Sequence, residues 1–475
     1  ATEKAVRLVR AGINRTRLTE PLEPVVVETT PKSLVVGGGV AGLRAALGLA
    51  EVGLDVFLVE KEAKLGGWVA GFRDMFPHGR NGRELIIKLE EKVRANPRIT
   101  VFTGAELVGK SGSFGNYQAT IAVSRGDELD TIQVDVGSIV IATGFDAYRP
   151  AEGELGFGLD GVVTIDEFKK LLDETAVTQN GSGPAPLTYQ GRPVATVAYI
   201  YCVGSRQDES VEGANTYCSR YCCTAAVHAA TQVAKLPARV HQYHFYRDMR
   251  TYGKYELLYA EALEKGAAFV KFPDDEPPAV ERDAKTGTIT VTARDLLSEG
   301  EQVALTADLV VLVTGMVPRE NEGLTKALKL PVGQSGFYNE IHPKLRPVET
   351  VVDGAYICGA CQGPKTSSEA VASGLAAVTQ SAAILKRGFA ELDPLVATVD
   401  TDVCTWCGAC ETTCPYDAIA MVDGGGKEIA AISKTACKGC GGCVPVCPSD
   451  AIDLQGYTDA QIRSMIDGML EVVCE

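Results

Sequence analysis

Residues 33–42 have the sequence SLVVGGGVAG, an apolar strand that runs directly into a glycine-rich turn. The residues from Gly42 to Val52 have helical periodicity, and Leu54 to Val59 form a second apolar run. Strand, glycine turn, helix and strand in this order predict a βαβ unit. Apolar runs at 139–141 and 310–313 each lead into Thr-Gly and are typical of strands covered on both sheet faces. The sequence therefore predicts an α/β fold with parallel sheets.

Three glycines of this turn indicate a nucleotide site. Gly37 permits a tight turn, Gly39 lets the backbone approach a pyrophosphate, and Gly42 lets the helix pack closely on the strand. Glu60 ends the second strand, where an acid accepts a hydrogen bond from a ribose 2′-hydroxyl and disfavours a 2′-phosphate. The alternative is an ordinary glycine-rich turn. The order of strand, turn, helix, strand and acid favours dinucleotide binding.

Three later stretches favour FAD as the dinucleotide: residues 65–67 (LGG), 141–144 (IATG) and 353–359 (DGAYICG), the last leading into a helix expected at 368–385. With these motifs, residues 31–390 resemble the thioredoxin-reductase-like disulfide oxidoreductase flavoproteins. The resemblance implies cofactor contacts from Gly37, Gly39, Gly42, Glu60, Lys61, Gly66, Gly67, Ala142, Thr143, Gly144, Gly359, Lys365 and Thr366. Those relatives carry a second glycine fingerprint for NAD(P)H. Here the matching strand, 196–201, runs into CVGSR instead, so we expect no nicotinamide site of that kind.

The cysteines are distributed unevenly along the chain. Of the fifteen, none lies in residues 1–201 and eight lie between 404 and 447, which favours metal ligands over a disulfide scaffold. The eight form two runs of C-x2-C-x2-C-x3-C-P, joined by a strand-like bridge at 427–433, in which the fourth cysteine of each run binds the cluster of the other. This predicts one 4Fe–4S cluster on Cys404, Cys407, Cys410 and Cys447, and a second on Cys437, Cys440, Cys443 and Cys414. Zinc is the alternative, but zinc sites rarely show two identical runs ending in Cys-Pro.

A third group of cysteines follows the strand at 196–201. It consists of Cys202, Cys218, Cys222 and Cys223. Their spacing alone is compatible with buried thiols, with a redox disulfide and with a metal cluster.

The motifs around this group resemble the A subunit of heterodisulfide reductase. They are CVGSR at 202–206, YCSRYCC at 217–223, DMRTYGK at 248–254, GPK at 363–365 and GYTDA at 456–460. The resemblance spans nearly the whole chain, without the N-terminal cysteine-bearing region and inserted ferredoxin domain of larger members. It implies that the third group binds another 4Fe–4S cluster near the flavin. It also implies a bifurcating or confurcating flavin that shares an electron pair between ferredoxin and another subunit of the complex.

Other residues have weaker claims. Lys254 is a candidate for stabilising reduced flavin, with a solvated lysine as an equal alternative. Lys365 and Thr366 open the helix at 368–385, so their backbone amides are expected to face the flavin ring. Cys358 and Cys361 are expected to be structural thiols, with a redox dithiol as the alternative. The five histidines show no metal-ligand spacing, and the tail thiol at 474 is expected to be incidental.

Composition limits the class of protein and its location. The chain has 475 residues and a formal net charge of −15, which argues against nucleic acid or an anionic membrane as the main partner. No apolar run is long enough to span a bilayer, and residues 1–10 lack a signal-peptide apolar segment, so we expect a cytoplasmic protein without a transmembrane segment. The sequence does not begin with Met, and whether residues precede Ala1 stays open.

The expected organisation is α/β, with two dinucleotide-binding-like domains of the thioredoxin-reductase type and a small α+β ferredoxin domain of the bacterial type. An N-terminal helix (residues 3–17) and connector occupy 1–30, and the FAD domain occupies 31–150 and 335–395. A middle domain with a Cys cluster and no glycine fingerprint occupies 151–334, and the ferredoxin domain occupies 396–475. A surface loop is expected at 178–192, and a polar connector with a β-turn between strands at 273–287.

Three functions follow, in order of preference. The first is a flavin-based electron-transfer subunit of a heterodisulfide-reductase-like complex, with FAD, two C-terminal 4Fe–4S clusters and a third in the middle domain. Its expected partners are other subunits, ferredoxin and a hydrogenase or formate dehydrogenase input module, around a homodimer. The second is a stand-alone ferredoxin:NAD(P)H oxidoreductase, disfavoured by the missing fingerprint. The third is a non-catalytic relay in which only clusters conduct.

Overall fold

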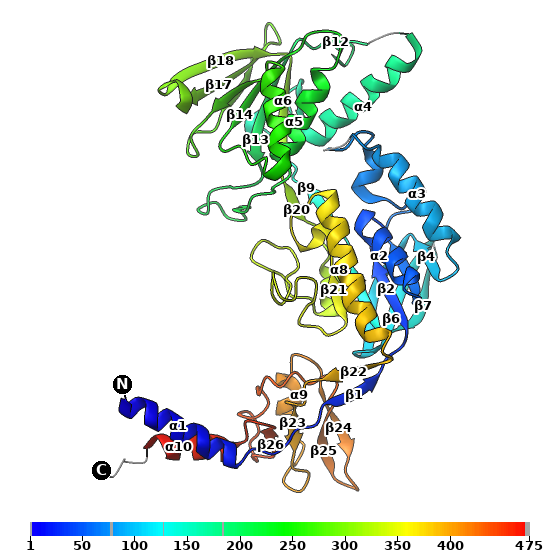
Figure 1. The fold of residues 1–475 in the computed structure, drawn as a ribbon, viewed down its shortest axis with the longest axis vertical. Coiled ribbons are helices and arrows are strands. Elements are labelled where there is room, and N and C mark those ends of the chain that lie inside the picture. Colours follow the sequence, from blue (N-terminus) through cyan, green and yellow to red (C-terminus); the bar gives the residue numbers. More distant parts are fainter. Residues whose placement is uncertain (1, 77–78, 127, 183–184, 471–475) are drawn as a thin grey trace. The chain divides into compact units, whose positions relative to one another are not determined.

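The computed structural model describes residues 2–76, 79–126, 128–182 and 185–470, so the thiol at 474 lies outside the described residues. The chain divides into two compact units (Figure 1). Unit 1 comprises residues 1–31, 111–117 and 384–475, and unit 2 comprises residues 32–110 and 118–383. Over the ranges that the structure describes, none of the helices is both long and apolar enough to traverse a bilayer.

The first half of unit 2 is built on a five-stranded parallel sheet of order β21-β8-β2-β3-β4. Its strands are β2 (Lys32–Val36), β3 (Asp55–Glu60), β4 (Ile99–Thr103), β8 (Ser138–Ile141) and β21 (Ala355–Ile357). Its helices are α2 (Val40–Glu51), α3 (Gly82–Ala95) and α8 (Ser367–Leu385). Leu34 and Val35 on the central strand are fully buried. The predicted strand, turn, helix and strand at the start of this half are confirmed. A separate sheet is formed by β5 (Ala105–Ser113), β6 (Asn116–Arg125) and β7 (Glu128–Val136).

The second half of unit 2 contains another five-stranded parallel sheet, of order β10-β19-β13-β14-β15. Its strands are β10 (Val162–Thr164), β13 (Thr196–Val203), β14 (His241–Tyr246), β15 (Ala268–Lys271) and β19 (Leu309–Thr314). Further elements are α4 (Ile165–Ser182), α5 (Cys222–Val233), α6 (Glu256–Glu264), α7 (Glu322–Leu328) and the antiparallel strands β16 (Ala279–Arg282), β17 (Ile289–Asp295) and β18 (Glu301–Ala307). The short strands β9 (Phe145–Ala147) and β20 (Met316–Pro318) pair between the two halves.

A buried histidine in this second sheet predicts acid sensitivity. His244 is fully buried, stacks on Tyr199 and Phe269, and its Nδ1 lies 3.0 Å from the Tyr201 hydroxyl. Burial lowers its pKa from 6.5 to about 3. The unfolded state binds this proton more readily than the folded state does. The contribution of neutral His244 to the free energy of unfolding is therefore fully present above pH 6.5 and is lost as the pH falls toward 3. We expect a loss of about 1–3 kcal/mol between pH 7 and 4. In denaturant titrations, His244→Phe should flatten this slope; an unchanged slope would contradict the assignment.

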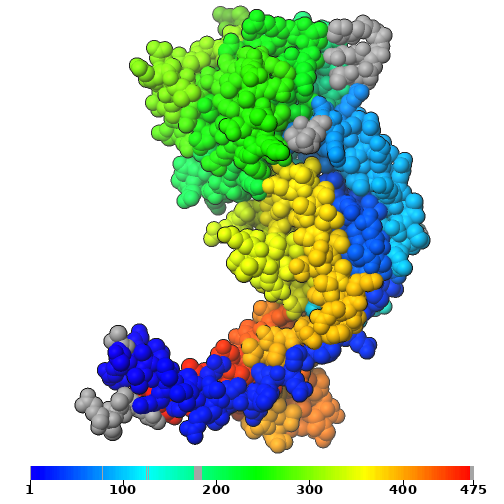
Figure 2. All heavy atoms as spheres, in the orientation of Figure 1, coloured from blue at the N-terminus to red at the C-terminus, as the bar shows by residue number. Residues whose placement is uncertain are grey.

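Unit 1 combines a helical pair with a small cysteine-rich core. Helix α1 (Thr2–Arg17), as predicted for residues 3–17, lies along α10 (Asp459–Leu470) (Figures 1 and 2). Strand β1 (Val25–Glu28) pairs antiparallel with β22 (Phe389–Leu392). The cysteine-rich part contains α9 (Ala409–Thr413) and two antiparallel strand pairs: β23 (Ala397–Val399) with β26 (Ile452–Leu454), and β24 (Ile419–Asp423) with β25 (Glu428–Ile432).

Two of the expected loops are wrong in part. Helix α4 continues to Ser182, into the segment predicted as a loop, and the strands β11 (Thr188–Tyr189) and β12 (Arg192–Pro193) follow. Once the buried Phe168 has fixed the first turns, each further helical residue adds a hydrogen bond at little cost. Within 273–287, residues 279–282 form β16 on the edge of β17, so the segment is a strand between two turns. The polar composition of this segment predicted a connector, but it could not show that residues 279–282 pair with β17.

Candidate functional site

The glycine turn after β2 forms an open cradle at the start of α2. An added Cβ would lie 2.3 Å from the Ala142 carbonyl oxygen at Gly37, and 1.8 Å from the Gly37 carbonyl oxygen at Gly42. No side chain tolerates such distances, so both positions require glycine. Gly39 has a φ of −74° and makes no side-chain cap hydrogen bond, and its Cβ would meet nothing within 4 Å. The first amides of α2 therefore border open space, which fits a pyrophosphate.

Glu60 and the Leu-Gly-Gly stretch form a second wall of this cradle. The buried Glu60 carboxylate accepts hydrogen bonds from the Gly38 amide at 2.5 Å and from the amide of the residue two positions later at 2.9 Å. The Gly66 amide donates to the Gly38 carbonyl at 2.8 Å. A Cβ on Gly67 would lie 3.4 Å from the Cα of Gly39. The acid and both glycines therefore lie beside the cradle, as a dinucleotide site requires.

The turn after β8, Ala142–Gly144, forms a third wall and is held by residues that the sequence analysis missed. The Arg319 guanidinium donates to the carbonyls of Thr143 at 3.2 Å and Phe145 at 3.1 Å. The Asn321 side-chain amide donates to the Thr143 hydroxyl at 3.3 Å. Both residues follow β20, far from the turn in sequence, and no local motif marks them. The one sequence signal for them is their position, since both are polar residues that follow shortly after the strand at 309–314.

The start of α8 is closed by a capping box. Glu369 accepts a hydrogen bond from the Thr366 amide at 2.8 Å, and its own amide donates to the Thr366 hydroxyl at 3.4 Å. This engages the Thr366 amide within the protein, contrary to the expectation that it faces the flavin ring. Lys365 is half-buried just before the box, and burial lowers its pKa. Gly359, after β21, donates its amide to Ser373 at 2.8 Å.

Cys358 and Cys361 lie beneath the same edge of the sheet. Both are buried, and burial raises the pKa of each thiol. The Cys361 thiol donates to the carbonyls of Ile141 at 3.4 Å and Cys358 at 3.1 Å. A protonated thiol that donates to backbone is a structural group, which supports the first of the two expectations over a redox dithiol.

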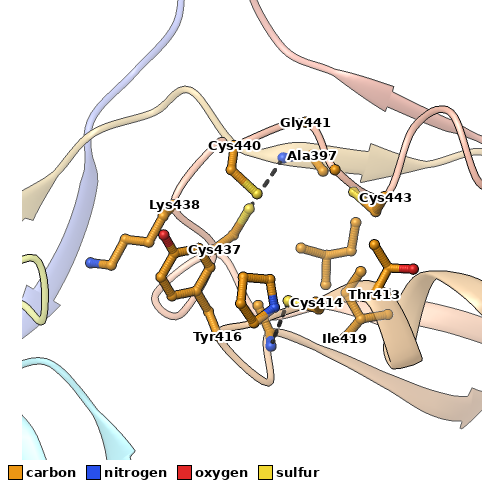
Figure 3. Close-up of a pocket in the computed structure, with 14 residues that line it drawn as sticks. Ala397, Thr413, Cys414, Tyr416, Ile419, Cys437, Lys438, Cys440, Gly441 and Cys443 are labelled. Carbon is orange, nitrogen blue, oxygen red and sulfur yellow. Dashed lines mark hydrogen bonds between the residues drawn. The ribbon is translucent and has the colours of Figure 1, made fainter. Parts of the chain in front are cut away.

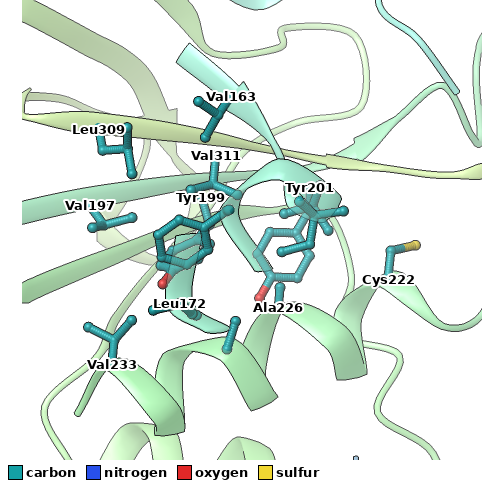
Figure 4. Close-up of a cluster of buried hydrophobic side chains, with 14 of the residues drawn as sticks. Val163, Leu172, Val197, Tyr199, Tyr201, Cys222, Ala226, Val233, Leu309 and Val311 are labelled. Carbon is teal, nitrogen blue, oxygen red and sulfur yellow. The ribbon is translucent and has the colours of Figure 1, made fainter. Parts of the chain in front are cut away.

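The third cysteine group lies where β13 ends and α5 begins. Cys202 is at the end of β13 with a left-handed φ of +62°, and Cys222 and Cys223 are the first residues of α5. Cys222 lies beside the hydrophobic core that contains Tyr201 (Figure 4). Burial raises the pKa of the Cys222 thiol well above its usual value, and the other three thiols raise it further. The structure therefore brings all four cysteines, including Cys218, within electrostatic range of one another.

Alternate residues of the segment 217–221 anchor this cysteine loop. The hydroxyls of Tyr217 and Tyr221 donate to the carbonyls of Met316 at 3.0 Å and Thr314 at 2.9 Å. The Ser219 hydroxyl accepts a hydrogen bond from the Met316 amide at 2.9 Å. These anchors, at the end of β19 and the start of β20, fix the backbone between the second and third cysteines of the group. The sequence analysis used the motif as a whole but missed the role of its tyrosines and serine.

Buried polar atoms without hydrogen-bond partners flank the same cysteines. Among the described residues, they include Ser205 Oγ, Arg206 Nη1, Thr224 Oγ1 and Thr314 Oγ1. Each such atom costs about 1–3 kcal/mol if nothing bonds to it. Sulfide and thiolate sulfurs of an iron–sulfur cluster accept hydrogen bonds from donors of this kind. The surroundings therefore fit a negatively charged cluster better than a set of purely structural thiols.

A cavity in unit 1 collects the cysteines of one predicted C-terminal cluster. It encloses about 370 Å³ of empty space, part of it open to solvent, and its lining includes Cys414, Cys437, Cys440 and Cys443 (Figure 3). Burial, together with the nearby Cys437, Cys440 and Cys414, raises the pKa of the Cys443 thiol to about 11. Cys414 thus lies with the three cysteines of the following run rather than with its own.

Backbone amides donate to the cysteine sulfurs in a repeated pattern. Ala430 donates to Cys404 at 3.4 Å and Ala451 to Cys447 at 3.3 Å, both in one predicted ligand set. In the other set, Ala397 donates to Cys437 at 3.5 Å and Ala418 to Cys414 at 3.4 Å. Amide donors stabilise thiolate charge. Each predicted cluster thus receives two equivalent amide bonds, one to the first cysteine of its own run and one to the crossing cysteine.

Two predicted site residues are exposed on the surface of unit 2. Lys61 is exposed and pairs with Glu106 at 3.5 Å, so the structure does not bring it into the cradle. Lys254 is exposed in a short 3-10 helix, Gly253–Tyr255. Within the described ranges, no group of three or more His, Cys, Asp or Glu side chains is arranged for a single metal ion. A four-iron cluster holds its thiolates further apart than one ion does.

Comparison with known families defines the class of protein. Residues 31–183 match the pyridine nucleotide-disulphide oxidoreductase family, and residues 397–454 match the 4Fe-4S dicluster domain family. The chain is an oxidoreductase, an electron-transfer flavoprotein with an FAD-type domain and iron–sulfur clusters. The predicted fold class is confirmed. The chain is also 32% identical, over nearly its whole length, to A subunits of heterodisulfide reductase, so it belongs to that family.

Curated relatives show this membership along nearly the whole chain. The chain is 32% identical to one of the A-type iron-sulfur subunits of CoB–CoM heterodisulfide reductase from Methanopyrus kandleri, covering 100% of this chain and 82% of the relative. It is also 32% identical to the corresponding protein of Methanocaldococcus jannaschii, covering 99% and 82%. Among solved structures, Thermoplasma acidophilum thioredoxin reductase, 16% identical, superposes with a TM-score of 0.49 over 74% of this chain and 99% of that one.

Proposed function

We propose that this chain binds one FAD and three 4Fe–4S clusters and converts two-electron transfer at the flavin into one-electron transfer at the clusters. The observation that carries this proposal is the presence, in one chain, of an open pyrophosphate cradle and three groups of four cysteines. A flavin can exchange electrons in pairs or singly, whereas each cluster takes one electron at a time. A protein that holds both is suited to convert between the two.

The residues of the chain supply distinct parts of this function. The cradle of Gly37, Gly39 and Gly42 would bind the pyrophosphate, and Glu60 would accept a hydrogen bond from the ribose. Arg319 fixes the turn after β8 that closes the site. The capping box at the start of α8 and the tyrosine anchors of the cysteine loop hold their segments rigid, which keeps distances between redox groups constant.

We further propose that the flavin divides an electron pair between two acceptors. The relative of Methanothermobacter marburgensis, 32% identical over 89% of this chain, is named as the A subunit of an H(2):CoB-CoM heterodisulfide,ferredoxin reductase, which gives that protein one donor and two acceptors. One electron would pass uphill to ferredoxin and the other downhill to another subunit of the complex. The separate cysteine groups of the middle and C-terminal domains are suited to serve as the two outlets.

The proposed partners follow from the same relatives. They are other subunits of a heterodisulfide-reductase-like complex, ferredoxin, and a hydrogenase or formate dehydrogenase as the source of electrons. The Methanococcus maripaludis relative carries both H(2) and formate in its name. A homodimer within the assembly belongs to the same proposal. A cytoplasmic location also belongs to it, because so many metal-binding thiols persist best in a reducing compartment.

A ferredoxin:NAD(P)H oxidoreductase is the second candidate, favoured by the match to the pyridine nucleotide family. The turn after β13, where a second nucleotide would bind, argues against it. Counted from the end of the strand, Gly204 corresponds to Gly37 and Arg206 corresponds to Gly39. A long side chain therefore stands at the position where the first turn has a glycine that borders open space.

An anaerobic titration of the holoprotein separates these candidates. NADH or NADPH is added in one series and reduced ferredoxin in another, while flavin and cluster absorbance are followed separately. We expect reduced ferredoxin to bleach both chromophores and both nicotinamides to leave the flavin oxidised. Rapid bleaching of the flavin by a nicotinamide alone would contradict the proposal and support the second candidate.

A further inference from the structure

Cations outnumber carboxylates beside the cysteine group of the middle domain. Arg206 pairs with Asp248 at 3.0 Å and Asp274 at 3.5 Å, and Arg247 also pairs with Asp274 at 3.5 Å. Arg250 and Lys271 each lie 3.7 Å from Asp248. Four cations therefore share two carboxylates within this network. The whole chain carries a net charge of −15, so this local excess of positive charge is not a general property of its surface.

Arg206 is the member of this network that is built into the cysteine group. Its amide donates to the Tyr217 carbonyl at 2.8 Å, directly before Cys218, and the preceding residue donates to the Cys202 carbonyl at 3.3 Å. The Arg206 side chain is only 15% exposed, and its Nη1 has no hydrogen-bond partner. The segment 205–206 is therefore tied to Cys202 on one side and to the residue before Cys218 on the other.

The Arg206 backbone adopts an unfavourable conformation to reach this place. Its φ is +56°, a left-handed value that is costly for a residue with a long side chain. The Arg247 guanidinium then donates to the Arg206 carbonyl at 2.5 Å, which places a second cation beside the first. The buried unpaired donor and the excess of cations over carboxylates leave positive charge that Asp248 and Asp274 do not balance. A cluster held by four thiolates supplies a compensating negative charge.

We propose that Arg206, supported by Arg247, raises the reduction potential of the middle-domain cluster above those of the C-terminal clusters. This inference rests on the proposed function, because it needs a cluster on the third cysteine group. A 4Fe–4S cluster with four thiolates is anionic, and its one-electron reduction adds a further negative charge. A nearby cation stabilises the reduced form more than the oxidised form, so the potential rises.

The C-terminal domain has the opposite charge balance. Residues 396–475 contain 12 Asp or Glu and only 4 Lys or Arg. Acidic surroundings disfavour the additional negative charge of a reduced cluster and lower its potential. The middle-domain cluster is therefore the electron acceptor of higher potential, and the two C-terminal clusters match the low-potential outlet toward ferredoxin.

An EPR-monitored redox titration of the holoprotein tests this assignment. The middle-domain signal is identified by its loss in Cys222→Ala. The titration uses dithionite as reductant together with redox mediators. Arg206→Gln should lower the potential of the middle-domain cluster, because one nearby positive charge is lost from a partly buried site. At the wild-type midpoint potential, the oxidised cluster of the variant should then exceed the reduced cluster by about tenfold. Arg206→Lys keeps the charge and should restore most of the wild-type value.

Two further variants complete the design. Arg192→Gln removes an exposed cation of the same domain that pairs with Asp160 at 2.8 Å, and should leave the potential unchanged. Arg247→Gln should lower the potential of the middle-domain cluster, as Arg206→Gln does. It replaces Arg206→Gln in the test if that variant fails to fold. Two results would overturn this inference but not the proposed function. One is a middle-domain cluster whose potential is the same in wild type and Arg206→Gln. The other is a middle-domain cluster that is reduced after the C-terminal clusters. A wild-type protein with only two clusters overturns the proposed cluster count together with it.

Discussion

Gly39→Ala is expected to weaken flavin binding and lower the flavin content while leaving the fold intact. The backbone at Gly39 has a φ of −74° that alanine adopts freely, and its Cβ would meet no protein atom within 4 Å. We therefore expect a change in unfolding free energy within about 1 kcal/mol. The new methyl group would instead occupy space that the pyrophosphate needs. Overpacking of this kind costs about 1–3 kcal/mol, or about tenfold to hundredfold in affinity.

Flavin content, iron content and thermal unfolding of the purified variants check this prediction. Gly12→Ala is the matched control, because its Cβ also meets nothing within 4 Å but lies in α1, in the other compact unit. Gly42→Ala should lose both flavin and stability, since its Cβ would lie 1.8 Å from a carbonyl oxygen. Full flavin content in Gly39→Ala would show that the nucleotide does not approach this turn.

Cys414→Ala is expected to remove the cluster of the second cysteine run rather than that of its own run. In the structure, Cys414 lines the cavity with Cys440 and the other two cysteines of that run. Loss of one of four thiolates should release about four irons per chain. A double variant with Cys440→Ala should lose no more iron, because both residues bind one cluster. A double variant with Cys407→Ala should lose about eight.

Iron analysis and EPR of the reduced protein distinguish these outcomes. Cys447→Ala provides the matching control. Combined with Cys407→Ala, it should lose no more iron than either single variant, because both residues are predicted to bind the other cluster. If Cys414→Ala combined with Cys407→Ala loses only about four irons, each run binds its own cluster and the crossed assignment is wrong.

Local patterns in the sequence were sufficient for the framework of the fold. The βαβ unit at residues 33–59 combines a strand, a glycine turn and a helix within a short segment, so neighbouring residues determine its geometry. The repeated cysteine runs are equally local, and the strand expected between them is present at 428–432. Absence of a second glycine fingerprint was also visible in the sequence.

Long-range contacts account for what the sequence analysis missed. Arg319 holds a turn more than one hundred residues earlier, and Tyr217 anchors the cysteine loop to residues that follow β19. No periodicity or motif encodes such pairs, because they depend on how the parallel sheets are assembled. The engagement of the Thr366 amide could have been predicted, since Thr366 and Glu369 have the spacing of a capping box. Arg206 stood in a quoted motif, yet only its burial and lack of a partner revealed its significance.

The central claim is that one chain carries one flavin and three four-iron clusters. The most direct test is to measure iron and FAD on the same anaerobically purified sample and to confirm the cluster type by Mössbauer spectroscopy. The account predicts about 12 irons per FAD, all in 4Fe–4S clusters, falling to about 8 in Cys222→Ala with FAD retained. About 8 irons per FAD in the wild-type protein, unchanged in Cys222→Ala, would contradict it.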